Sequence, residues 1–197
     1  MKRLSVLLLK IKKSKKEDQL ISACLKQDLQ AQKALYERFA STMLFVCLRY
    51  VQNRQEAEDL MIKGFTKVFK KLAQFKSDGS FQAWVRRIMV NECLEYLRSN
   101  KSMYLEIDLE KADLKAGYAL LPQNLEVEDL MKMIEQLPTG YRTVFNLFAL
   151  EGYSHNEIAQ MLQISVNTSK SQLSRGRKLL QQYLLQSEKE RKIAQPI

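Results

Sequence analysis

The 197-residue chain has little of what most catalytic and metal-binding sites require. It holds one histidine, His155, and three cysteines, Cys24, Cys47 and Cys93, which stand far apart and form no Cys-x-x-Cys pair. A zinc site needs several such ligands at short spacings, so we expect none. Isolated cysteines at apolar positions instead indicate buried thiols in a reducing compartment, the cytoplasm.

Glycine is also scarce, with six residues in all, and the chain contains no glycine-rich phosphate-binding loop. We therefore expect no enzyme activity, no cofactor, no metal and no small-molecule substrate. The first residues, MKRLSVLLLKIKKSKK, lack a long unbroken apolar run and a small-residue cleavage site, which argues against a signal peptide or a membrane span. They predict a basic N-terminal extension, for which a weak amphipathic helix is one alternative.

Positive charge dominates, with a formal net charge of +10, but it is unevenly distributed. Residues 1–16 hold seven basic residues and no acid, whereas residues 104–130 hold seven acids against two basic residues. An acidic segment between basic blocks suggests two domains that face nucleic acid, joined by a linker that DNA repels.

Apolar residues recur at helical spacing through nearly the whole chain, and no stretch shows the sustained alternation of a strand. We predict an all-α protein with two small helical domains and a flexible acidic linker between them. The predicted segments are an N-terminal extension (1–17), a first domain (18–103), the linker (104–124), a second domain (125–186) and a C-terminal tail (187–197).

Residues 154–180 predict a helix-turn-helix. Ser154 and Glu157 have the spacing of a capping box, Gln163-Ile164-Ser165 makes a turn, and a second helix follows. No acidic residue lies between Glu157 and Glu188. A basic helix after a tight turn is what this motif places in the major groove of DNA, and the alternative is a surface helical hairpin with an ordinary solvated face. We expect Asn167, Thr168, Lys170, Ser171, Gln172 and Arg175 on the outer face of the second helix. The candidate DNA contacts are these six together with Ser165 of the turn and Arg177, which follows near the C-terminal end of the helix.

A second group of residues follows a predicted helix cap at Ser80. The only tryptophan, Trp84, precedes a basic pair, and the same helix continues through Asn91 to Arg98. Aromatic and arginine side chains together can stack on unpaired bases and hold phosphates. The alternative for Trp84 is a place in the core beside Phe81.

Taken in order, these pieces resemble the extracytoplasmic-function (ECF) sigma factors of bacterial RNA polymerase, in the sigma-70 family. The first domain resembles sigma region 2 through A-E-D-L at residues 57–60, Phe65, and F-x-A-W-V-x-R-I-x-x-N at residues 81–91. The second resembles sigma region 4 through four motifs in sequence: L-P-x-x-Y-R-T-V-F at 137–145, L-E-G-Y-S at 150–154, E-I-A-x-M-L at 157–162 and K-S-x-L at 170–173.

The resemblance implies a promoter-specificity subunit that binds core RNA polymerase and promoter DNA and helps to open the duplex. It implies that the helix-turn-helix reads the −35 element and that an anti-sigma factor holds the protein inactive. The residues implied to capture the −10 strand are Trp84, Arg86, Arg87, Asn91 and Arg98. The residues implied to contact the polymerase are Asp59, Leu60, Ile62, Lys63, Phe65 and Phe69.

The chain departs from the family pattern at Ile62-Lys63, where the family often has Gln-Glu, and in the second helix of the helix-turn-helix. There Ser169 replaces an apolar packing residue and Gln172 replaces a phosphate-type contact. A stand-alone helix-turn-helix regulator is the alternative function, but it leaves the motifs of the first domain unexplained. A helical adaptor, a third alternative, would not bind DNA in a salt-dependent way.

Overall fold

The computed structural model describes residues 15–76, 79–100 and 127–194. Every regular element in these ranges is helical, which confirms the predicted all-α class. Contacts group the chain into two compact units, one of residues up to 48 with 53–92, the other of residues 49–52 with those from 93 onward. The predicted linker and nearly all of the predicted N-terminal extension lie outside the described residues. Within the described ranges, no helix is both long enough and apolar enough to cross a membrane.

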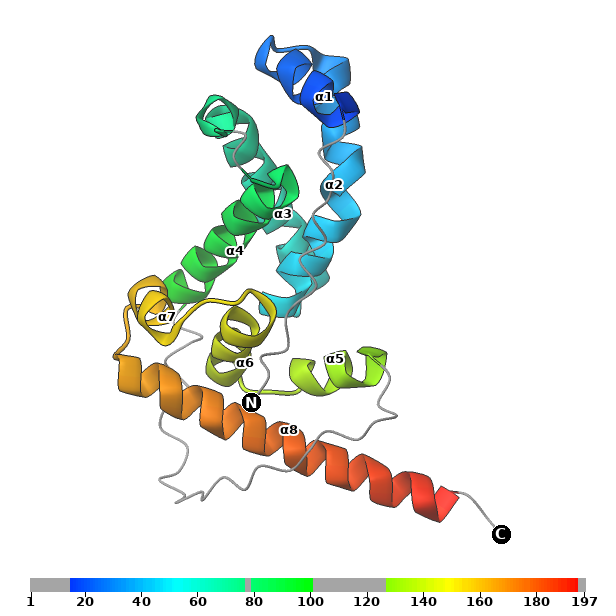
Figure 1. Cartoon of the computed structure of the whole chain (residues 1–197). Helices are drawn as coiled ribbons and strands as arrows, with labels where there is room; N and C mark the ends of the chain where they lie inside the picture. The colour runs from blue at the N-terminus through cyan, green and yellow to red at the C-terminus, as the bar shows by residue number, and fades with distance from the viewer. Residues whose placement is uncertain (1–14, 77–78, 101–126, 195–197) are drawn as a thin grey trace. The chain divides into compact units, whose positions relative to one another are not determined.

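The first unit is built from helices (Figure 1). The elements are α1 (Lys15–Leu25), α2 (Leu29–Tyr50), α3 (Arg54–Lys71), the short 3₁₀ turn η1 (Leu72–Gln74) and α4 (Phe81–Ser99). The chain breaks between α1 and α2 at Asp28, whose Oδ1 accepts hydrogen bonds from the backbone N–H of Gln30 (2.8 Å) and Ala31 (3.1 Å). Asn53 caps α3 in the same way, and Ser80 caps α4, as predicted for Ser80.

The core of the first unit is made by one apolar stripe from each long helix. Each stripe repeats at helical spacing, because residues three and four apart lie on one face. The buried side chains include Leu35, Phe39, Met43 and Val46 of α2, Leu60, Phe65 and Val68 of α3, and Phe81, Val85 and Met89 of α4. All three cysteines are buried and none is part of a disulfide, which confirms the prediction of buried thiols.

The second unit is arranged along one long helix (Figure 1). Its elements are α5 (Val127–Glu135), α6 (Thr139–Phe145), the π-helical turn η2 (Asn146–Leu150), α7 (His155–Leu162) and α8 (Val166–Ala194). Helices α5, α6 and α7 all contact α8. Met133, Ile134 and Leu137 pack against Leu180 and Leu184 of α8 in one apolar cluster.

The segment that follows α6 widens into η2, where the N–H of Glu151 donates to the carbonyl of Asn146 five residues earlier (3.0 Å). Helix α8 continues to Ala194, so the predicted C-terminal tail begins inside this helix.

Gly64 is the point of close approach between α3 and α4. A Cβ atom at this position would lie 2.2 Å from Sδ of Met89, whose side chain has no exposed surface. We expect Gly64→Ala to lower the free energy of unfolding by about 1–2 kcal/mol, because the overlap outweighs the helix propensity that alanine gains. Urea unfolding measures this. Gly79→Ala is the matched control, since a Cβ there meets nothing within 4 Å. A Gly64→Ala variant as stable as the parent would contradict the close packing.

Candidate nucleic-acid and polymerase interfaces

The helix-turn-helix is built as its sequence predicts. The Ser154 Oγ accepts from the backbone N–H of Glu157, and the Glu157 carboxylate accepts from the backbone N–H of Ser154, which completes the capping box. Helix α7 ends at Gln163 in the left-handed conformation, with φ of 56°. Ser165 then caps α8 by accepting from the N–H of Thr168 (2.9 Å). The turn is therefore fixed at both sides by local hydrogen bonds.

One face of α8 is open to solvent. Its exposed residues recur at three- and four-residue spacing, so they form one continuous stripe. We name this the α8 stripe, and it consists of Asn167, Lys170, Ser171, Ser174 and Arg177. The sequence-based list contained four of these residues and missed Ser174, which is small, uncharged and part of no motif. Helical spacing from Lys170 and Ser171 is the signal that identifies it.

Gln172 corrects the sequence-based prediction. It was expected on the outer face, but it is only 4% exposed and lies on the inner face of α8, beside Leu173. Its Oε1 has no hydrogen-bond partner in the described residues. A side chain this buried does not share the open face of α8 with Lys170 and Ser171. Thr168 and Arg175 are half-buried, at the margin of the α8 stripe.

His155 links α7 to α8. Its Nδ1 lies 2.9 Å from Oγ of Ser169, which is fully buried, as expected of a residue at an apolar packing position. The imidazole stacks on the ring of Phe148, with centroids 4.7 Å apart, and the Arg177 guanidinium lies 5.5 Å from the same Phe148 ring. Burial, followed by the nearby charges of Lys170 and Arg177, holds the pKa of His155 below its usual range.

The second candidate surface lies along α4. Trp84, Arg87 and Asn91 share one helical face, and Arg87 and Asn91 are exposed. Trp84 is half-buried, and its ring packs beside those of Phe75 (5.5 Å) and Phe81 (5.7 Å). Trp84 therefore packs partly against core residues, as the alternative reading of this residue predicted. The rest of its side chain is exposed to solvent. We name Trp84, Arg87 and Asn91 the α4 face.

The other two residues predicted for strand capture are placed differently. Arg86 is half-buried and lies on a neighbouring side of α4. Arg98 is half-buried near the end of the helix, and contacts assign it to the second unit rather than the first. Glu95, which is exposed, stands between Asn91 and Arg98 on the same face, so this stripe carries a negative charge that the α8 stripe lacks.

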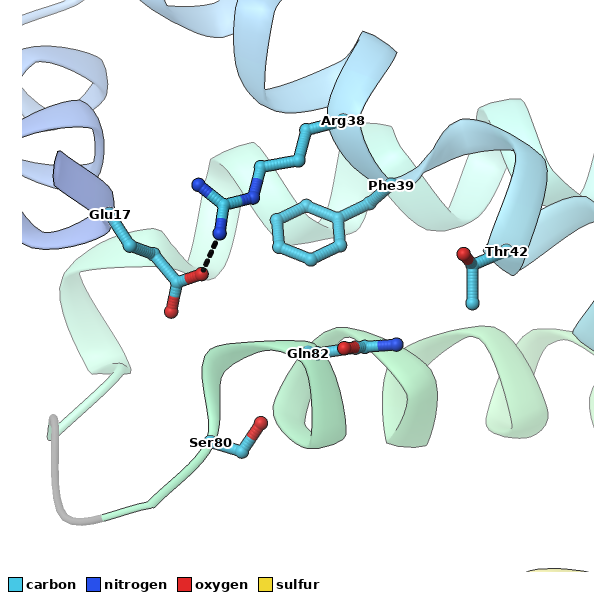
Figure 2. A pocket seen from close by; sticks show the side chains of 6 residues that line it. All are labelled: Glu17, Arg38, Phe39, Thr42, Ser80 and Gln82. Atoms are coloured by element: carbon cyan, nitrogen blue, oxygen red, sulfur yellow. Dashed lines mark ion pairs between the residues drawn. The ribbon is translucent and has the colours of Figure 1, made fainter. Parts of the chain in front are cut away.

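A small pocket opens beside the start of α4 (Figure 2). Its volume is about 190 Å³, and its walls are formed by Glu17, Arg38, Phe39, Thr42, Ser80 and Gln82. Arg38 of α2 and Glu17 of α1 point toward each other and form an ion pair of 3.0 Å. The cation in the wall is thus already neutralised, so the pocket has little attraction for an anion.

The predicted polymerase contacts on α3 fall into two groups. Asp59, Ile62 and Lys63 are exposed, and Ile62 leaves 54% of its surface open although it is apolar. Leu60 and Phe65 are buried, and the Phe65 ring packs edge-on against Tyr36 at 4.8 Å. These two side chains therefore support α3 from inside and do not face a partner. Phe69 is half-buried.

In the part of the chain that the structure describes, no group of three or more His, Cys, Asp or Glu residues is placed to hold a metal ion.

Comparison with known protein families gives two matches, which lie in different parts of the chain. The family model "Sigma-70 region 2" matches residues 35–103, and the model "Sigma-70, region 4" matches residues 128–180. The chain is an RNA polymerase sigma factor of the ECF group in the sigma-70 family. A stand-alone regulator is not favoured, because the match includes region 2 as well as the helix-turn-helix.

Two related proteins are sigma factors by name. This sigma factor is 27% identical over 180 residues to the RNA polymerase sigma-H factor of Pseudomonas aeruginosa, covering 85% of this chain and 93% of the relative. It is 28% identical over 173 residues to the ECF RNA polymerase sigma-E factor of Escherichia coli, covering 82% and 90%. Among solved structures, it is similar to the sigma factor RpoE of Bartonella quintana, which was solved in complex with the anti-sigma factor NepR. The two chains are 23% identical with a TM-score of 0.47, and the match covers 78% of this chain and 96% of the other.

The lowered pKa of His155 makes the stability of the sigma factor depend on pH. The unfolded chain binds a proton at this residue near pH 6.5, whereas the folded chain binds it only at lower pH. Stability should therefore fall as the pH drops below about 6.5, until the folded-state pKa is reached. We expect His155→Phe, which keeps a ring on Phe148, to reduce this loss. Thermal unfolding from pH 7.5 to 5 measures it, and identical pH profiles for the two proteins would contradict the assignment.

Proposed function

We propose that the α8 stripe reads the −35 promoter element in the major groove. The observation that carries this proposal is the one-sided character of α8. Lys170 and Arg177 stand on the open face with three small polar side chains, and no acid occurs between Glu157 and Glu188. Cations are suited to the phosphates, while Asn167, Ser171 and Ser174 are suited to base edges. In this proposal the buried Gln172 does not contact DNA, whereas Ser165, Thr168 and Arg175 support the end of α8 and the margin of the stripe.

We propose that the α4 face captures the unpaired −10 strand. Trp84 is held by Phe75 and Phe81, so its open part is a rigid platform on which a base can stack. Arg87 and Asn91 stand on the same side, where they supply a cation and a hydrogen-bonding amide. Arg86 and Arg98 lie beside this face and stay candidates for phosphate contacts.

We propose that α3 docks on core RNA polymerase through Asp59, Ile62 and Lys63. An exposed aliphatic side chain between two charges of opposite sign is suited to an interface with an apolar centre and a polar rim. Phe69 lies at the edge of this surface, and Leu60 and Phe65 hold the helix in place from the core.

The wider proposal follows from membership of the ECF group. We propose that the protein acts in the cytoplasm, that it is not an enzyme, and that an anti-sigma factor restrains it. In this proposal, residues 18–103 bind the polymerase and the −10 strand, and residues 125–186 bind the −35 element. Residues 104–124 form the linker between them.

Run-off transcription tests the proposal directly. The full chain is added to core polymerase on a pool of genomic promoter fragments, and the start sites that depend on it are sequenced. We expect a small set of start sites that share two elements. Equal transcription of the same sites by core polymerase alone would refute the role in promoter recognition.

Lys170→Ala tests the phosphate contact of the α8 stripe. On an upstream duplex without a −10 element, the slope of log affinity of the holoenzyme against log salt should fall by about one, nearly independently of sequence. Lys132→Ala is the matched control, because Lys132 is an exposed lysine of α5 outside the stripe. Equal slopes for the two variants would remove Lys170 from the DNA contact.

Arg87→Ala and Asn91→Ala test strand capture. Both side chains are exposed, so thermal stability should change by less than about 0.5 kcal/mol. We expect the variant holoenzymes to bind the upstream duplex normally but to open the promoter poorly, as measured by permanganate reactivity of unpaired thymines. Lys70→Ala, at an exposed position of α3, is the control. Normal opening by both α4 variants would make this face a scaffold.

A further inference from the structure

The junction of α7 and α8 holds a polar contact at a place where helices usually pack apolar side chains. Ser169 has no exposed surface, and its hydroxyl lies 2.9 Å from Nδ1 of His155, the first residue of α7. A buried hydroxyl is tolerated only when it has a partner. Ser169 and His155 therefore depend on each other, and a valine or alanine at residue 169 would not need the histidine.

The contact continues back to the DNA-facing side of α8. The imidazole of His155 stacks on Phe148 with an interplanar angle of 25°, and the Arg177 guanidinium lies over the same Phe148 ring. We name Ser169, His155, Phe148 and Arg177 the His155 stack. It starts on the buried side of α8, passes through α7 and η2, and ends at an exposed cation of the α8 stripe.

A hydrogen bond between two helices restricts their arrangement, because it weakens steeply when the distance or angle departs from its optimum. Serine has one short rotatable bond, so it cannot follow a shift of α7 along α8. At the other end, a guanidinium held over an aromatic ring has fewer rotamers to lose when it meets a phosphate.

We infer that the His155 stack positions α8 for DNA, and that it sets the base preference of the α8 stripe at the −35 element without touching the bases. This inference rests on the proposed function of the α8 stripe. His155 and Ser169 are positioning residues, and their effect on DNA passes through the angle of α8 and the placement of Arg177.

Four variants of the full chain separate the two contacts of His155. His155→Phe keeps a ring on Phe148 but has no nitrogen for Ser169. His155→Asn loses the ring but keeps a polar atom close to the place of Nδ1. Ser169→Ala removes the hydroxyl, and His155→Phe with Ser169→Ala removes both partners.

The measurement is the affinity of each reconstituted holoenzyme for the upstream duplex of a promoter found by run-off transcription, and for the same duplex with single base changes. It is made well below the Tm of every variant. We expect Ser169→Ala and His155→Phe each to bind the intact duplex roughly five- to tenfold more weakly and to discriminate less among the base changes. The double variant should be no weaker than either single variant, and His155→Asn should recover about half of the loss on a logarithmic scale.

Two results would contradict the inference. If both single variants keep the parent's base preference while only Tm falls, the His155 stack is merely structural and the inference is wrong. Additive losses in the double variant would also overturn it, because the two residues would then act independently. Failure of the proposed function has a different signature, in which Lys170→Ala and Ser171→Ala leave binding of the upstream duplex unchanged. If His155→Phe fails to fold, the comparison of Ser169→Ala with His155→Asn still decides between these outcomes.

Discussion

The close contact between α8 and α6 at Gly176 is the constraint on which the second unit depends. A Cβ atom at residue 176 would lie 3.3 Å from Cβ of Tyr141 and 3.6 Å from its carbonyl oxygen, so the two helices meet almost backbone to backbone. The inner face of α8 is closely packed, and the side chains of Ser169 and Leu173 on this face are buried. The α8 stripe is on the opposite side of the same rigid helix. Its orientation is therefore determined by packing that never touches DNA.

Buried polar groups connect the elements around this helix. Arg142 of α6 is only 4% exposed, and its Nη1 donates to the carbonyl oxygens of Leu137 (2.9 Å) and Glu135 (3.0 Å) at the end of α5. A cation at this place satisfies carbonyls that the ending helix leaves without partners and complements the negative end of its dipole. The arginine of the L-P-x-x-Y-R motif thus has a physical role: it holds α5 to α6, and α5 in turn closes the apolar cluster with Leu180 and Leu184 of α8.

Much of this architecture was predictable, because the helix ends depend on residues close together in the sequence. The caps at Ser80 and Ser154 each need only a side-chain oxygen and an N–H three residues later, and both were predicted from the sequence. The burial of Gln172 was not predicted, because its polar character suggested the outside. Gln172 lies three residues after Ser169 and four before Gly176, so it shares their buried face of α8. The π-helical turn η2 was not predicted either, because apolar spacing does not distinguish a bond over five residues from the usual bond over four.

Sequence resemblance was least informative about which side chains face outward. Leu60 and Phe65 belong to the residues that resemble region 2, yet both are buried in the core. A family motif can include residues that pack the core as well as residues that contact a partner.

The two proposed DNA surfaces differ in charge in a way that suits their targets. Duplex DNA presents phosphates on both strands, and the α8 stripe meets it with cations and no opposing acid. The face of α4 beyond Asn91 includes Glu95, an exposed carboxylate that weakens attraction for phosphates in general. A surface with reduced long-range attraction must rely on short-range contacts, and Trp84 and Asn91 offer stacking and hydrogen bonding that only an unpaired base can accept in full. Selectivity for single strand over duplex follows from this balance, because stacking on Trp84 is available only after the base has left its partner.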